Sequence, residues 1–126
     1  QLRADHIRVF ADSHVKHGSH AIVADRSIQE LTRDVDFFEA DAVIATGQRT
    51  GDSATLGEID EIRAATELPP RVGSGVTPAN VCQILGRTQG VIVASTMKVD
   101  GVWWNEVELA RVKHFMSVAQ AALEEA

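Results

Sequence analysis

The sequence predicts an α/β fold made of four consecutive βα units. Four short, mostly apolar runs alternate with segments whose apolar residues recur at helical spacing. Runs of this kind are typical of parallel strands that are covered on both faces. Each helical segment also begins with a residue that can cap a helix. Together these observations favour βα units over separate groups of strands and helices.

A helical segment separates each predicted strand from the next. In order, they cover residues Ile7–Val15, Ala42–Thr46, Arg71–Val76 and Gly90–Ala94.

The first two predicted helices begin at capping boxes, Ser27 with Glu30 and Thr55 with Glu58. In such a box the hydroxyl oxygen of the first residue accepts the backbone N–H of the third helical residue. One apolar face follows each box, made by Ile28, Leu31 and Val35 in one helix and by Leu56, Ile59 and Ile62 in the other.

The last two helices carry different start signals. Thr77 precedes Pro78, which needs no acceptor in a first helical turn, and Asn105 with Glu108 is expected to open the final helix. The expected buried stripes are Val81, Ile84 and Leu85 in one helix and Val112, Phe115, Ala119, Ala122 and Leu123 in the other.

Composition limits the class of protein. The 126 residues suffice for one domain, and 18 acidic against 12 basic residues leave a net charge of −6. This charge argues against nucleic acid or an anionic lipid surface as the main partner, and no apolar stretch is long enough for a membrane span. The single Cys82 favours a reducing, cytoplasmic setting, and we expect a buried, inert thiol. Because the first residue is Gln1, we expect residues 1–126 to be part of a longer chain.

Four βα units allow two architectures, a small open sheet or one half of an eight-stranded barrel. A half barrel would leave its first and last strands unpaired and would need a partner to close it. Either way, ligands bind at the carboxyl ends of the strands.

Two of these strand ends predict a phosphate site. Gly73, Ser74 and Gly75 turn the third strand into the next helix, where backbone N–H groups can approach an anion closely. Ser95 and Thr96 follow the fourth strand and add two hydroxyls. The alternative is that the glycines only permit a tight turn.

Three further residues at strand ends are candidate ligand contacts: Thr46, Arg49 and Lys98. Arg49 could clamp a carboxylate or phosphate, or it could lie on the surface.

The end of the first strand carries the candidate acid–base groups. Strand alternation places Asp12, His14 and Lys16 on one face, next to the expected ligand. The alternative is a set of charges that pair with one another. His14, His17 and His20 recur every third residue, but this spacing gathers ligands on a helix and not on a strand. We therefore predict no metal site and no cofactor.

Trp103 and Trp104 precede the last helix. A lid on the barrel rim or a subunit contact is favoured over a stacking platform.

Five motifs in register resemble the BtpA/SgcQ family along essentially the whole chain. They are Phe10–His17, Asp25–Ile28, Ala40–Gly47 with Thr50–Gly51, Gly73–Val81 and Ser95–Gly101, and the likeness ends in Arg111–Met116. The chain departs from the family at Leu68–Arg71, where the third strand usually continues with apolar residues.

The resemblance implies the carboxyl-terminal half, strands five to eight, of a (β/α)8 TIM barrel of the ribulose-phosphate-binding type. Strands one to four would come from the rest of a longer chain or from a second subunit, and we expect a homo-oligomer. The family's names point to photosystem I biogenesis and to a role in sugar metabolism.

Two functions of different classes remain open. One is binding of a small phosphorylated metabolite, with proton transfer or hydrolysis on a sugar phosphate or nucleotide if the protein is an enzyme. In that case Asp12 or His14 is the expected base, and Lys16 or Arg49 stabilises negative charge. The other is a non-catalytic assembly or stability factor that uses the barrel surface.

Overall fold

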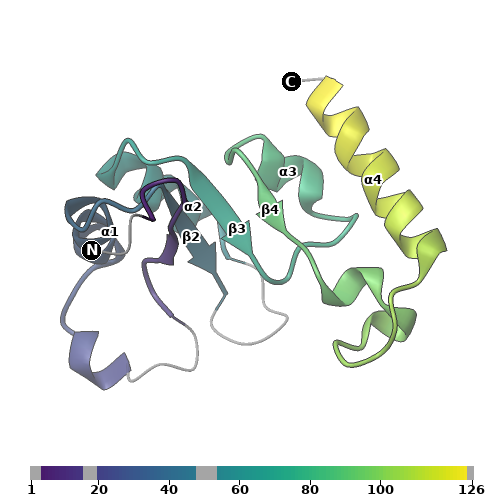
Figure 1. Ribbon diagram of the computed structural model, residues 1–126, viewed down its shortest axis with the longest axis horizontal. Helices are drawn as coiled ribbons and strands as arrows, with labels where there is room; N and C mark the ends of the chain where they lie inside the picture. Colours follow the sequence, from purple (N-terminus) through teal and green to yellow (C-terminus); the bar gives the residue numbers. More distant parts are fainter. Residues whose placement is uncertain (1–3, 16–19, 48–53, 125–126) are drawn as a thin grey trace.

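The computed structural model describes residues 4–15, 20–47 and 54–124, and it forms alternating strands and helices (Figure 1). The strands are β1 (Phe10–Asp12), β2 (Ala42–Thr46), β3 (Pro70–Gly73) and β4 (Val91–Ile92). The α-helices are α1 (Ile28–Phe37), α2 (Leu56–Ala65), α3 (Val81–Leu85) and α4 (Leu109–Glu124). Three short 3-10 helices complete the described part: η1 (His20–Val23), η2 (Ser95–Met97) and η3 (Val99–Gly101). The predicted α/β class is therefore confirmed.

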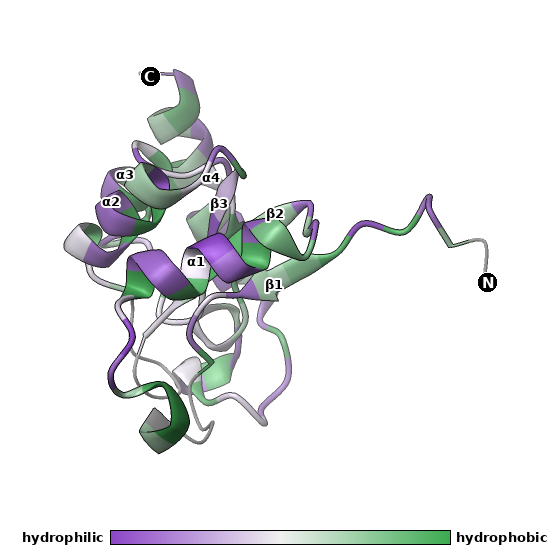
Figure 2. Ribbon diagram, turned by 90° about the vertical axis from the view of Figure 1, so that its left-hand side faces the viewer, coloured by the Kyte–Doolittle hydropathy of each residue, from purple (hydrophilic) through white to green (hydrophobic). Residues whose placement is uncertain are grey.

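The four strands form one parallel sheet in the order β1-β2-β3-β4, which is also their order in the chain. Because crossovers between parallel strands are right-handed, an unbroken order of this kind places every connecting helix on the same face of the sheet. The helices lie together beside the strands in an end-on view (Figure 2). This arrangement is compatible with a half barrel.

The core fills the space between this sheet face and the helices. Val43 and Ala45 of β2 and Val72 of β3 point into it, and they pack with the fully buried Ile59 and Ile62 of α2. The core also contains Val81 and Ile84 of α3 and Phe115 and Ala119 of α4. The alternating residues of β2, among them Ile44, point to the opposite face.

One cation lies on that opposite face. The guanidinium of Arg71 on β3 lies 5.8 Å from the ring centroid of Phe10 on β1, although a strand separates the two residues. Gly90 gives it room, because a Cβ there would lie 3.0 Å from Cδ of Arg71. Phe10 and Ile92, at the two ends of the same face, are still 50% and 49% exposed. The sheet face that points away from the core is therefore only partly covered.

Two capping predictions are confirmed. The Ser27 Oγ accepts the Glu30 N–H at 3.2 Å, and the Thr55 Oγ1 accepts the Glu58 N–H at 3.1 Å. Helices α1 and α2 therefore begin where the sequence predicts.

The strands other than β2 are shorter than predicted. β1 begins only at Phe10, because the Val9 N–H donates to the Asp41 carboxylate at 2.8 Å and not to a strand. It ends at Asp12, where the chain bends. β3 ends at Gly73 because Ser74 adopts a left-handed conformation, with φ of 78°.

The starts of the last two helices were predicted wrongly. α3 begins at Val81, because the side chain of Asn80 accepts the Thr77 N–H at 2.8 Å and holds residues 77–80 in a turn. The amide of Asn105 donates to the Val99 carbonyl at 3.0 Å, and α4 begins at Leu109 instead.

A pair of glycine substitutions tests the packing of the open sheet face. A Cβ at Gly73 would lie 3.1 Å from Ile44 Cγ2, whereas one at Gly57 meets only Thr55 Oγ1, at 3.9 Å. We expect Gly73→Ala to lower the free energy of unfolding by about 1–3 kcal/mol. Gly57→Ala should raise it by about 0.4–1 kcal/mol, since it restricts only the unfolded chain. Urea unfolding measures both, and equal effects would contradict the described packing.

Candidate functional site

A pocket of about 490 Å³ lies where β3 and β4 end. Its walls come from the turn after β3, the segment after β4 and the segment that leads to α4. The lining residues are Ser74, Gly75, Val76, Thr77, Ile92, Ala94, Ser95, Thr96, Gly101 and Trp103. Four residues of the predicted phosphate site, Ser74, Gly75, Ser95 and Thr96, are thus brought together.

The backbone of the β3 turn takes an uncommon path. Ser74 and Gly75 both have positive φ, at 78° and 66°. Glycine adopts this conformation freely, but serine does so only at a cost in energy, and strained residues of this kind cluster at functional sites. Gly73, the last residue of β3, does not line the pocket but packs beneath it against Ile44.

Two hydrogen bonds of a single side chain stabilise this turn. The Asn80 side chain accepts the Thr77 N–H at 2.8 Å and donates to the Gly75 carbonyl at 2.9 Å. The Thr77 N–H is therefore already used within the turn. Backbone donors for a ligand must come from earlier residues of the turn or from the facing segment.

The facing segment is the short helix η2. Its first intrahelical hydrogen bond joins the Met97 N–H to the Ala94 carbonyl at 3.0 Å. The backbone N–H groups of Ser95 and Thr96 come before the first intrahelical bond. No carbonyl group of the helix therefore accepts a hydrogen bond from them. Both residues are half-buried and line the pocket.

The pocket lining suits a negative charge. Its described lining residues carry four hydroxyl side chains, those of Ser74, Thr77, Ser95 and Thr96, and none of these residues carries a carboxylate. This is notable in a chain with 18 acidic residues. Lys98 is not part of the lining, because its Nζ donates to the Trp103 carbonyl at 2.6 Å and so fixes the neighbouring segment.

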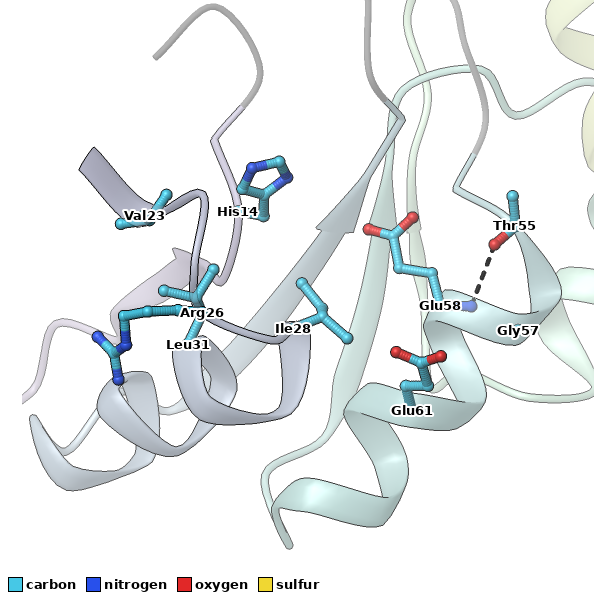
Figure 3. A pocket seen from close by; sticks show the side chains of 9 residues that line it. All are labelled: His14, Val23, Arg26, Ile28, Leu31, Thr55, Gly57, Glu58 and Glu61. Atoms are coloured by element: carbon cyan, nitrogen blue, oxygen red, sulfur yellow. Dashed lines mark hydrogen bonds between the residues drawn. The ribbon is translucent and has the colours of Figure 1, made fainter. Parts of the chain in front are cut away.

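A second pocket, of about 340 Å³, lies between α1 and α2 and shares no residue with the first (Figure 3). His14, Arg26, Glu58 and Glu61 line it, together with Val23, Ile28, Leu31, Thr55 and Gly57. His14 was expected beside the phosphate site, but the chain bends after Asp12 and carries it to this second pocket. Its carbonyl accepts the Thr46 Oγ1 hydroxyl at 3.2 Å.

Asp12 stays on the open face of the sheet, because it is in register with Ile44. The predicted row of Asp12 and His14 along one face is therefore not formed. Lys16 and Arg49 lie outside the described residues, as does His17.

Glu58 also lines the second pocket, although the sequence predicts only a helix-capping role for it. Burial of this half-buried side chain raises the pKa of its carboxyl group, and the nearby Glu61 raises it further. A hydrogen bond from the Thr55 backbone acts in the opposite direction and completes the capping box. The apolar residues of α1 that create this burial are about thirty positions away in sequence.

The structure also shows the position of Cys82, the spacing of possible metal ligands and the character of the helices. Cys82 is exposed, which corrects the expected buried thiol: it lies on the outer side of α3, next to the inward-facing Val81. Within the described ranges, no three His, Cys, Asp or Glu side chains gather to hold a metal ion. The same ranges contain no helix that is both long and apolar enough to span a membrane.

The profile of the BtpA family matches residues 1–121. An uncharacterized mitochondrial protein of Caenorhabditis elegans is 36% identical over 115 residues, which cover 91% of this chain and 41% of that protein. An uncharacterized protein of Methanocaldococcus jannaschii is 33% identical over 94% of this chain and 44% of its own length. The photosystem I biogenesis protein BtpA of Synechocystis is 28% identical over 98% of this chain and 42% of its own length. The chain thus spans about two fifths of these relatives, and no solved structure matches it.

Glu58→Gln tests the burial of the second pocket. The raised pKa means that ionisation of Glu58 opposes folding. This penalty is absent below the unfolded-state pKa, grows as the pH rises through the folded-state pKa and is complete above it. Glutamine keeps the capping acceptor without the charge, so the variant should be more stable than wild type at pH 7, and this advantage should shrink at pH 4. Urea unfolding at both pH values checks this, and an equal difference at both would contradict it.

Proposed function

The chain belongs to the BtpA family, and on this premise we propose that it binds a small phosphorylated metabolite at the ends of β3 and β4. The observation that carries the proposal is the convergence of Ser74, Gly75, Ser95 and Thr96 around one pocket, whose described lining residues include no carboxylate. The phosphate oxygens would accept hydrogen bonds from these hydroxyls and from the backbone N–H groups of Gly75, Ser95 and Thr96.

If the protein is an enzyme, proton transfer or hydrolysis on this ligand is the reaction we propose. Asp12 is the candidate base, because it shares the open sheet face with Ile92, which lines the pocket. His14 opens into the other pocket, so it is a weaker candidate for a step at the phosphate end.

The second candidate function is a non-catalytic assembly factor. Similarity to a protein named for photosystem I biogenesis favours it. An assembly factor needs a surface and no small ligand, so a titration with phosphate separates the two functions.

The cytoplasmic location stays a prediction, since the relative from Caenorhabditis elegans is described as mitochondrial.

We also propose that the sheet is the carboxyl-terminal half of a (β/α)8 barrel whose other half comes from a further polypeptide of βα units. Three features support this: an unbroken strand order, a half-covered sheet face and the position of β1 and β4 as the outer strands of the described sheet. A cavity of about 660 Å³ also lies between β4 and α4, where the next strand of a barrel would pack. Its walls are mainly apolar and include Leu85, Val91, Val93, Phe115, Met116 and Leu123.

Isothermal titration with inorganic phosphate tests the anion site. We expect saturable binding that weakens at least about ten-fold in the double variant Ser95→Ala with Thr96→Ala, because two hydrogen bonds to a charged group are lost. Ser117→Ala, on the exposed side of α4, is the matched control and should bind as wild type does. Absence of saturable binding to wild type would contradict the proposal and favour the assembly factor.

The mass of the isolated chain in solution tests the half barrel. One chain has a mass of 13.6 kDa, and unpaired strand edges should make copies associate, so we expect dimers or larger species by light scattering. A stable monomer at micromolar concentration would contradict the half barrel and favour an open sheet.

A further inference from the structure

The pocket also has apolar lining residues that inorganic phosphate alone would not use. Besides the hydroxyls, its lining contains Val76, Ile92, Ala94 and Trp103. Its volume of about 490 Å³ falls in the range of sites that enclose a whole small molecule. An anion at the hydroxyls would leave these apolar residues in contact with water.

Trp103 lies on a loop whose base is held by hydrogen bonds. The Val99 N–H donates to the Glu106 carbonyl at 2.9 Å, and Lys98 pairs with Val107 in an isolated antiparallel bridge. The Lys98 Nζ also donates to the Trp103 carbonyl at 2.6 Å. These contacts fix the base of the loop and place Trp103 near its tip.

The indole is both oriented and accessible. It meets Trp104 edge to face, with ring centroids 5.3 Å apart, which restricts its rotation. It is nevertheless 61% exposed, while its neighbours in the pocket lining are smaller apolar or hydroxyl side chains. A large aromatic surface held open beside an anion site is suited to stacking against a flat ring.

We infer that the ligand is a phosphate ester that carries a planar aromatic ring, a nucleoside monophosphate in class, with its ring against Trp103. This inference rests on the proposed phosphate site and narrows its ligand from sugar phosphates to nucleotides. Trp103 acts as a specificity residue: it contacts the ring and leaves the phosphate contacts to Ser95 and Thr96. This role differs from the lid or subunit contact that the sequence favours for Trp103.

The test compares three probes by calorimetry: inorganic phosphate, ribose 5-phosphate and adenosine 5′-monophosphate. We expect the nucleotide to bind wild type at least about ten-fold more tightly than ribose 5-phosphate, the effect of one stacked base. Trp103→Ala should remove this preference and keep the affinity for ribose 5-phosphate, which also shows that the variant is folded. Trp104→Phe is the matched control and should keep the preference, and its single remaining indole should report nucleotide binding by fluorescence.

Two results separate the inference from the function on which it rests. Equal affinity for nucleotide and ribose 5-phosphate, or a preference that survives in Trp103→Ala, would overturn the stacking role while the phosphate site stands. Failure of all three probes to bind would overturn the phosphate site and the inference together.

Discussion

Parallel pairing in the order of the chain is the constraint on which the other features depend. Each strand lies beside the strand that follows it, and right-handed crossovers keep the helices on one face. As a result, all strands end at the same edge, and the turns after β3 and β4 must be neighbours. That Ser74 and Ser95 line one pocket therefore follows from topology, although the residues are more than twenty positions apart.

The same constraint leaves the second face of the sheet with little cover. The Arg71 guanidinium lies near the Phe10 ring there, and Gly90 leaves room for its side chain. A guanidinium on this face is unusual for a sheet that packs against apolar layers. Once buried, its N–H groups need hydrogen-bond acceptors. In the proposed barrel, the polypeptide that closes this face would have to supply them.

Local signals predicted the second strand and the starts of the first two helices. The Ala42–Thr46 strand matches its apolar run residue for residue, and the hydroxyls of Ser27 and Thr55 cap the helices that follow them. What could not be predicted depends on distant partners. The Asp41 carboxylate accepts the Val9 N–H, which shortens the first strand. Burial between two helices raises the pKa of Glu58. The residues of the proposed phosphate site lie at predicted strand ends, but the position of Trp103 depends on the pairing of residues 98 and 107, which no local pattern shows.

Backbone N–H resonances measured during a titration with inorganic phosphate test the anion site most directly, because they report each donor separately. We predict saturable downfield shifts for the amides of Gly75, Ser95 and Thr96, with much smaller changes at Gly57 and Glu58 beside the other pocket. Shifts that do not saturate, or that are largest around Glu58, would contradict an anion site at the ends of β3 and β4.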